Sequence, residues 1–264
     1  LVEQRRELDL LSLAQEQKYP LLLELYQRKK KQKTNQKMSQ QITQNLKTVK
    51  EKIEKTNQNI RLVAVTKTRS PKEVSAAISA GIISIGENKV QEAEQKFLET
   101  PLVVGIEKRL IGKLQSNKIK RAIQIFDTID SVDSVRLARK ISQAATAIKK
   151  TQRVLIQVNT TNEETKGGFS LESESEIIQC FDFSGIKIEG LMTIGPTEKD
   201  EEKKQEAFKR LKRVFLKINK KVEPEKQMKD LSMGMSGDFL IGISEGATMV
   251  RIGSLIFGER EARA

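Results

Sequence analysis

The sequence contains no histidine. Histidine is the usual general base of Ser–His–Asp triads and Cys–His dyads, and it is a common zinc ligand in proteins. Its absence excludes those catalytic and metal sites in one step, and we expect no metal site. Any chemistry must therefore come from lysine, hydroxyl, carboxylate or arginine side chains, from the single cysteine, or from a bound cofactor.

Cysteine occurs once, at Cys180, so the chain cannot form an internal disulfide. Apolar runs are short as well, and none approaches the roughly 20 residues that a membrane-spanning helix needs. The first residues lack the apolar core of a secretory signal. These absences together predict a cytoplasmic protein without membrane contact, and we expect a monomer.

Aromatic residues are scarce, with nine phenylalanines, two tyrosines and no tryptophan. The formal net charge of +13 favours a nucleic-acid partner. However, the 48 lysines and arginines are spread along the chain, and few aromatic rings are available to stack on bases. We therefore expect no specific nucleic-acid binding, and salt-dependent binding to a generic duplex would test the alternative.

Residues 1–37 differ from the rest of the chain. Their leucine spacing indicates two helical pieces broken at Pro20, and the basic run 28–33 follows. We expect an N-terminal extension, helical or disordered, that lies outside the fold, and one domain over residues 38–264. A basic anchor for a membrane or for nucleic acid is the functional alternative for this extension.

Hydrophobic periodicity predicts alternating strands and helices after an initial helix. That helix starts at Met38 and carries Ile42, Leu46, Val49 and Ile53 on one stripe. Eight short strands with seven helices between them predict a parallel sheet closed into a (β/α)8 TIM barrel. An open doubly wound sheet is the alternative, but its usual glycine-rich first turn is missing from residues 66–70. The expected strands are 61–66, 82–85, 109–111, 125–130, 153–158, 186–192, 230–235 and 247–252.

Lys67 directly follows the first expected strand. Residues 62–66 are apolar or β-branched, which is typical of a strand buried on both faces, and Ser70, Pro71 and Glu73 form the pattern of a capping box that opens a helix. An ammonium group is costly to bury, so a lysine at this position tends to become a nucleophilic amine. The alternative is a side chain that reaches solvent or pairs with a carboxylate.

Two further loops have the character of an anion site. Ser236 lies between glycines after the seventh strand, at an expected helix N-terminus, and Gly253 and Ser254 finish the eighth strand. Barrels often bind phosphate at these two loops. For either loop alone the simpler interpretation is structural, since Ser236 could only cap its helix and Gly253 could only turn the chain.

A reactive lysine beside a phosphate site suits an aldehyde that carries a phosphate. Pyridoxal 5′-phosphate (PLP) is such a ligand, with Lys67 as its Schiff base and Arg251 facing the ring nitrogen. The alternative for Arg251 is a salt bridge in the barrel mouth. A phosphosugar aldolase would also use a Schiff-base lysine, with Glu87 as the only nearby carboxylate that we would nominate as acid or base.

Several stretches resemble the pyridoxal phosphate homeostasis proteins (the YggS/PROSC group). The resemblance implies a barrel of the alanine racemase N-terminal-domain type (fold-type III) with PLP on Lys67. It also implies a role in intracellular PLP homeostasis, in which the protein buffers PLP or delivers it to apo PLP enzymes. The matching stretches are 63–68, 86–92, 111–118, 131–134, 166–169, 190–195, 231–236 and 247–254. The cofactor-binding residues expected from these arguments are Lys67, Asn88, Met235, Ser236, Arg251, Gly253 and Ser254.

The chain departs from the family pattern at two strands. The family commonly carries an aromatic residue and a histidine where this chain has Lys108 and Arg109, and a histidine where it has Asp130. We expect these changes to alter the rim of the barrel and to leave the lysine and the phosphate loops intact.

Racemisation on PLP requires a base on each face of the ring, and related racemases use a tyrosine opposite the lysine. The only tyrosines, Tyr19 and Tyr26, lie in the N-terminal extension. We therefore expect a carrier that is not an enzyme, with a PLP-dependent amino-acid racemase as the alternative. Glu87, Asp130 and Cys180 are the first residues to examine for a second base.

Overall fold

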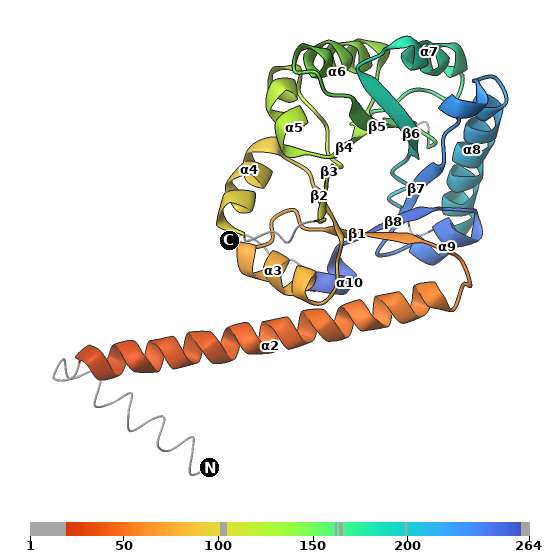
Figure 1. Cartoon of the computed structure of the whole chain (residues 1–264). Coiled ribbons are helices and arrows are strands. Elements are labelled where there is room, and N and C mark those ends of the chain that lie inside the picture. Colours follow the sequence, from red (N-terminus) through yellow and green to blue (C-terminus); the bar gives the residue numbers. More distant parts are fainter. Residues whose placement is uncertain (1–19, 101–104, 162, 164–165, 199, 260–264) are drawn as a thin grey trace.

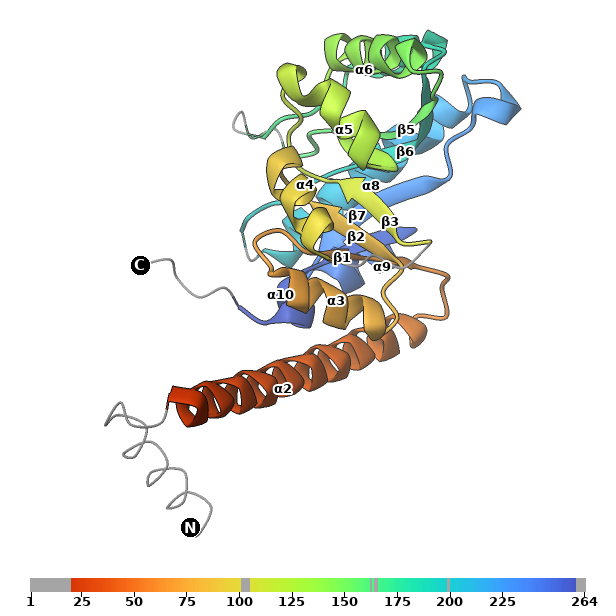
Figure 2. The same ribbon diagram turned by 60° about the vertical axis from the view of Figure 1, so that its left-hand side comes forward.

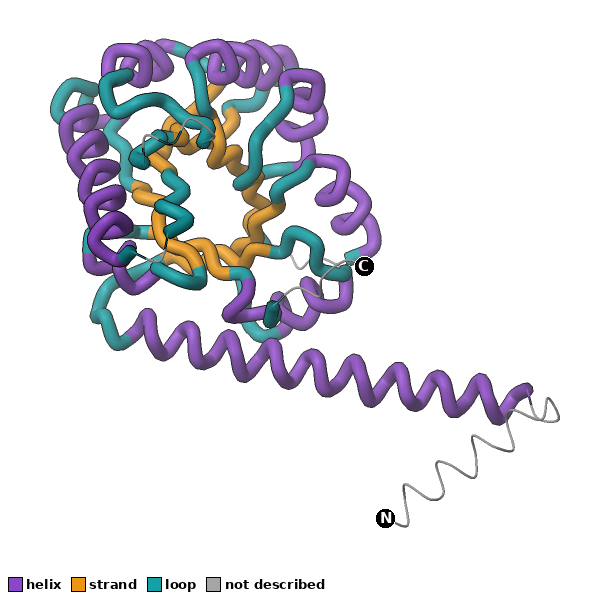
Figure 3. The backbone as a smooth tube through the Cα atoms, turned by 180° about the vertical axis from the view of Figure 1, so that it is seen from behind, coloured by secondary structure: helices purple, strands orange, loops and turns teal. Residues whose placement is uncertain are grey.

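The structure is a computed structural model that describes residues 20–100, 105–161, 163, 166–198 and 200–259. Eight parallel strands form a closed barrel in the order β1 to β8, with β8 paired to β1. The strands form a ring that is enclosed by helices (Figure 3). This confirms the predicted (β/α)8 fold and excludes the open sheet. The strands are β1 (Arg61–Val65), β2 (Ser84–Glu87), β3 (Glu107–Leu110), β4 (Thr128–Val132), β5 (Gln152–Gln157), β6 (Ile186–Met192), β7 (Asp230–Met235) and β8 (Met249–Ile252).

Helices surround the strands on the outside of the barrel (Figure 1). The capping box predicted at Ser70 and Glu73 is present at the start of the first of these helices. Three short 3-10 turns (Ser116–Lys118, Cys180–Asp182 and Pro224–Lys226) add to them. The helices are α3 (Pro71–Ser79), α4 (Val90–Glu99), α5 (Ile119–Ile125), α6 (Val135–Ala147), α7 (Glu174–Gln179), α8 (Glu201–Asn219), α9 (Phe239–Ser244) and α10 (Ser254–Phe257).

Strand boundaries differ from the expected ones by up to three residues where apolar residues precede the strand. Ile125 still belongs to α5 and Phe126 ends that helix, so β4 starts later than predicted and runs on to Val132. Ile83 is exposed, and β2 begins at Ser84, which pairs with Glu107. Both shifts move the strand ends toward the carboxyl side, so Glu87 and Asp130 lie within strands.

Helix α2 (Pro20–Glu54) is continuous through residues 37 and 38, the expected boundary of the barrel domain. Its predicted stripe of Ile42, Leu46, Val49 and Ile53 is buried and packs onto α3 and α10. The first part of the helix runs out past the barrel in both views (Figures 1 and 2). The helical piece expected before Pro20 lies outside the described residues.

Alternate strand residues face two different cores. Outward residues such as Ala64, Leu110 and Ile129 join the hydrophobic cluster between the sheet and the helices. Their neighbours Arg109 and Asp130 therefore point into the barrel, where both are fully buried.

Within the described residues, no helix is both long and apolar enough to span a bilayer.

We predict that α2 is an integral part of the fold from Ile42 onward. Leu46 is 1% exposed, so Leu46→Ala should lower the free energy of unfolding by about 2–5 kcal/mol. Urea unfolding followed by circular dichroism measures this loss. The exposed neighbour Lys47→Ala is the control and should change little, and equal stabilities for the two variants would contradict the packing of α2.

Candidate functional site

A pocket of about 250 Å³ opens at the carboxyl ends of β1, β7 and β8. These ends meet because β8 pairs with β1 on one side and with β7 on the other. Six of the seven residues singled out from the sequence line this pocket. Its lining is Val65, Lys67, Arg69, Met235, Ser236, Gly237, Arg251, Gly253 and Ser254.

Asn88 is the seventh of these residues, and it does not line the pocket. It lies half-buried just after β2, where its backbone packs so closely on Gly112 that a Cβ there would come within 2.3 Å of the Asn88 carbonyl oxygen. That contact fixes the backbone of Asn88 against the next loop. A role for Asn88 in binding the cofactor stays a prediction.

Lys67 stands in a tight turn between β1 and α3. The Arg69 amide donates to the Thr66 carbonyl oxygen at 3.0 Å, and Thr68 adopts a left-handed backbone with φ of 64°. Ser70 then caps α3. The Lys67 side chain is half-buried and lies at the pocket wall, so the strand, the turn and the cap together place an amine there.

The two predicted anion loops lie against each other. The Gly253 amide donates to the Ser236 Oγ at 3.2 Å. The backbone amides of Ser236, Gly237 and Ser254 donate to no acceptor within the described residues. A Cβ added at Gly237 would have no atom within 4 Å, so the space in front of this loop is open. The loops therefore offer amides and hydroxyls to an anion.

One detail of the prediction for these loops is wrong. Helix α9 begins at Phe239, and Asp238 occupies its N-cap, so Ser236 precedes the helix and does not cap it. The Asp238 carboxylate instead accepts from the Met235 amide at 2.6 Å. Because α9 and α10 are short, the local amides and hydroxyls, and not helix dipoles, are the groups that these loops offer to an anion.

Arg251 forms the inner wall of the pocket and is 4% exposed. Its guanidinium donates to the Ser232 Oγ at 2.7 Å and to the Thr193 carbonyl oxygen at 2.8 Å. Burial lowers the pKa of Arg251 to about 10, so the group stays charged at neutral pH. Within the described residues it has no carboxylate within 4 Å, which disfavours the salt-bridge interpretation.

Arg109 and Asp130, which we expected to alter the rim, are wholly buried in the barrel. They form a two-fold contact with Nε–Oδ2 and Nη2–Oδ1 distances of 2.9 and 3.0 Å. Burial favours loss of the Arg109 proton, but the Asp130 carboxylate outweighs it and raises the pKa of Arg109. For these two residues the rim expectation is wrong, because β4 continues past Asp130 and both side chains are buried in the barrel. Arg109 Nη1 also lies 2.9 Å from Glu107 Oε2.

The three candidate second bases are all engaged elsewhere. Glu87 is fully buried against Lys96, with 2.6 Å between Oε1 and Nζ, and Asp130 pairs with Arg109. Burial, with Glu176 and Asp182 nearby, raises the pKa of the buried Cys180 thiol to about 12. Lys96 itself was missed from the sequence, although its position three residues after the buried Ala93 of α4 was a signal.

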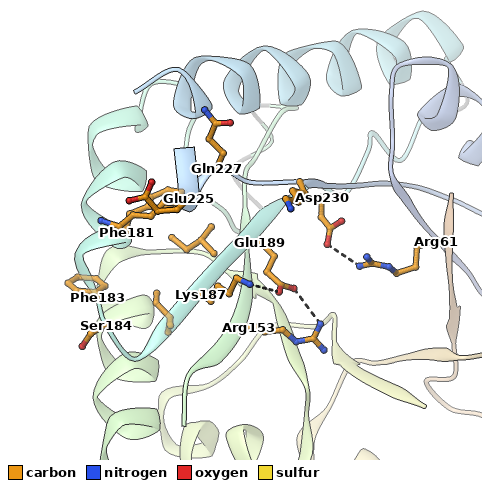
Figure 4. Close-up of a pocket in the computed structure, with 14 residues that line it drawn as sticks. Arg61, Arg153, Phe181, Phe183, Ser184, Lys187, Glu189, Glu225, Gln227 and Asp230 are labelled. Atoms are coloured by element: carbon orange, nitrogen blue, oxygen red, sulfur yellow. Dashed lines mark hydrogen bonds and ion pairs between the residues drawn. The ribbon is translucent and has the colours of Figure 1, made fainter. Parts of the chain in front are cut away.

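A larger pocket of about 440 Å³ lies at the amino ends of β5, β6 and β7 (Figure 4). Lys67 follows the carboxyl end of β1, so this pocket lies at the other end of the barrel. Several of its charged side chains pair with one another, as Arg61 does with Asp230 at 3.0 Å and Arg153 with Glu189 at 3.5 Å. Barrel proteins build their reactive sites at the carboxyl ends of the strands. We therefore assign the functional site to the smaller pocket.

Residues 38–261 match the family described as alanine racemase, N-terminal domain. A pyridoxal phosphate homeostasis protein of Synechocystis is 36% identical over 203 residues, which covers 76% of this chain and 92% of that protein. The structure of PipY from Synechococcus elongatus with PLP bound has a TM-score of 0.76 and 30% identity, and the match covers 82% of this chain and 100% of that one.

A barrel with a lysine after its first strand and anion loops after its last two strands defines the class, and the chain belongs to the alanine racemase N-terminal domain family. An alanine racemase of Clostridium difficile shares only the fold, at a TM-score of 0.72 and 17% identity over 84% of this chain and 58% of that one. Within the class, the chain belongs to the pyridoxal phosphate homeostasis proteins.

We predict that Arg109 and Asp130 stabilise the fold only as a pair. Asp130→Ala should cost about 3–5 kcal/mol of unfolding free energy, because it leaves a buried guanidinium without its main partner. The double variant Arg109→Met/Asp130→Leu should recover most of that loss. Urea unfolding provides the comparison, with Glu198→Ala in the exposed Lys203 pair as a control that should leave the free energy of unfolding nearly unchanged. Additive losses in the double variant would contradict the pairing.

Proposed function

We propose that this protein binds pyridoxal 5′-phosphate covalently at Lys67 and takes part in PLP homeostasis in the cytoplasm. The observation that carries the proposal is that the Lys67 amine lines the same pocket as the two loops that contain Ser236 and Ser254. The names of the curated relatives and the PLP-bound structure of PipY support the same ligand.

The residues of the pocket fit the three chemical parts of PLP. Lys67 provides an amine for the aldehyde, and the Ser236 and Ser254 loops provide amides and hydroxyls for the phosphate. Arg251 lines the same pocket and would provide a fixed cation for the edge of the ring. A ligand that lacks either the aldehyde or the phosphate would leave one of these groups unused.

Lys67 forms the covalent bond in this proposal. A lysine amine and an aldehyde condense with loss of one water, which takes the aldehyde oxygen and the two amine hydrogens, so Lys67 would hold PLP through a carbon–nitrogen double bond. When bound, PLP supplies an electrophilic carbon that a second amine can attack in turn. The reaction is reversible, so Lys67 can both store the aldehyde and release it.

Arg251 determines how the ring is used. A guanidinium only donates hydrogen bonds and stays charged, so Arg251 would disfavour protonation of a ring nitrogen bound beside it. An unprotonated ring withdraws electrons weakly, which disfavours chemistry on amino acids. We propose that the protein acts as a monomeric carrier that buffers PLP and delivers it to apo PLP enzymes, in agreement with relatives that are named homeostasis proteins.

The first prediction for this function concerns the covalent site. The purified protein loaded with PLP should show a visible absorbance band, and borohydride reduction should fix the cofactor on Lys67, as peptide mass spectrometry would detect. Lys67→Ala should keep its circular dichroism spectrum and lose the band, because no other lysine lines the pocket within the described residues. Lys113→Ala, at an exposed lysine, is the control. Reduced cofactor on a different lysine would disprove the site.

The second prediction concerns the phosphate. Losing a hydrogen bond to a charged group costs about 1.5–3 kcal/mol, so Ser236→Ala and Ser254→Ala should each weaken PLP binding roughly ten- to a hundred-fold. Binding of pyridoxal, which has no phosphate, should change much less. Ser244→Ala is the matched control, since its hydroxyl donates within α9 to Ile241. Equal losses for PLP and pyridoxal would mean that the serines do not bind the phosphate.

A further inference from the structure

Lys96 is a buried lysine of α4 that lies outside the pocket lining. It is 5% exposed, and its Nζ contacts the Glu87 Oε1 at 2.6 Å, the Glu92 Oε1 at 3.1 Å and the Thr66 carbonyl oxygen at 2.6 Å. An ammonium has three hydrogens to donate, so these three acceptors use all of them. A buried cation is tolerated only when it is paired and hydrogen-bonded in this way.

The acceptors of Lys96 hold the backbone on both sides of Lys67. On one side, the Thr66 carbonyl oxygen accepts from Lys96, and the Thr66 hydroxyl donates to Glu87 at 2.7 Å. On the other side, the Thr68 amide donates to Glu92. Lys67 is therefore the residue between two anchored neighbours, and all the anchors belong to one cluster of Lys96, Glu87 and Glu92, which we call the α4 clamp.

The turn needs such anchors because Thr68 has a φ of 64°. A β-branched residue in the left-handed region costs about 1–2 kcal/mol and persists only where its surroundings hold it. Glu92 supplies that hold as an anion. Burial opposes its ionisation, but the Thr68 amide and Lys96 outweigh this and lower the pKa of Glu92.

We propose that the α4 clamp consists of positioning residues that preset the Lys67 turn, so that the amine meets the aldehyde without first ordering its backbone. The proposal rests on the function proposed for Lys67. Fixing a reacting group beforehand removes an entropic cost from the covalent step and leaves other contacts of the ligand unchanged. The clamp should therefore affect covalent capture and not the anion loops.

The test begins with the cofactor-free protein. Amide hydrogen exchange of the segment 66–69 should be about tenfold faster in Glu92→Ala than in the wild type, the effect of about 1.4 kcal/mol of lost anchoring. Glu92 is only partly buried, so this variant should fold. Lys96→Met/Glu87→Gln, which removes both charges of the buried pair, is the second variant and should show the same change.

The ligand comparison uses PLP and pyridoxine 5′-phosphate, which carries an alcohol in place of the aldehyde. In both variants, affinity for PLP and the rate of its covalent capture should fall about tenfold, while affinity for pyridoxine 5′-phosphate stays within about twofold. Lys150→Met is the matched control, because Lys150 also donates to two carbonyl oxygens, those of Ile123 and Phe126, far from the pocket.

Each outcome decides the proposal. Equal losses for the two ligands would show a general structural role and overturn the positioning role, as would unchanged exchange of segment 66–69. If the wild type instead fails to capture PLP at Lys67, the proposed function is wrong. The exchange measurement needs no cofactor, so it still decides whether the clamp orders the turn.

Discussion

Closure of the barrel is the constraint on which the site depends. β8 pairs with β1 and with β7, so residues from the two ends of the domain come together. In an unclosed sheet of this strand order, β1 and β8 would lie at opposite edges, and Lys67 would be far from Gly253. Arg69 also links the two ends of the domain. Its guanidinium donates to the carbonyl oxygen of Phe257, the last residue of α10, at 3.2 Å. The Lys67 amine and the loops of Ser236 and Ser254 therefore share one pocket because the sheet closes.

Buried charge is arranged differently in the scaffold and in the site. Arg109 and Lys96 are each matched by a buried carboxylate, so their charges are neutralised where they lie. Arg251 is as deeply buried, but it is held by the hydroxyl of Ser232 and a carbonyl oxygen, which orient the guanidinium without cancelling its charge. Arg109 and Lys96, which pair with carboxylates, belong to the scaffold. Arg251, whose charge is oriented but not neutralised, lines the pocket.

The sequence predicted those features that depend on local pattern or on topology. Alternating periodicities predicted the eight strands. The meeting of strand ends at one face of a barrel led to seven predicted residues, of which six line the pocket. The ion pair between Arg109 and Asp130 depends on a long-range contact and was missed. Asn88 lies outside the pocket lining, and its role in binding the cofactor stays a prediction. Lys96 was overlooked because its partners come from β2, α4 and the Lys67 turn.

The same arrangement explains why a carrier is the better description than a racemase. Moving a proton between the two faces of a substrate needs a base on each face, and each base must reach the reacting carbon. The Glu87 carboxylate pairs with Lys96, and the Asp130 carboxylate pairs with Arg109. Burial raises the pKa of the Cys180 thiol, so that thiol stays protonated. Within the described residues, the pocket lining offers one lysine amine, the guanidinium groups of Arg69 and Arg251, and the hydroxyls and amides of the Ser236 and Ser254 loops. These groups can bind a phosphorylated aldehyde and return it by the reverse of the same condensation, which requires no second base.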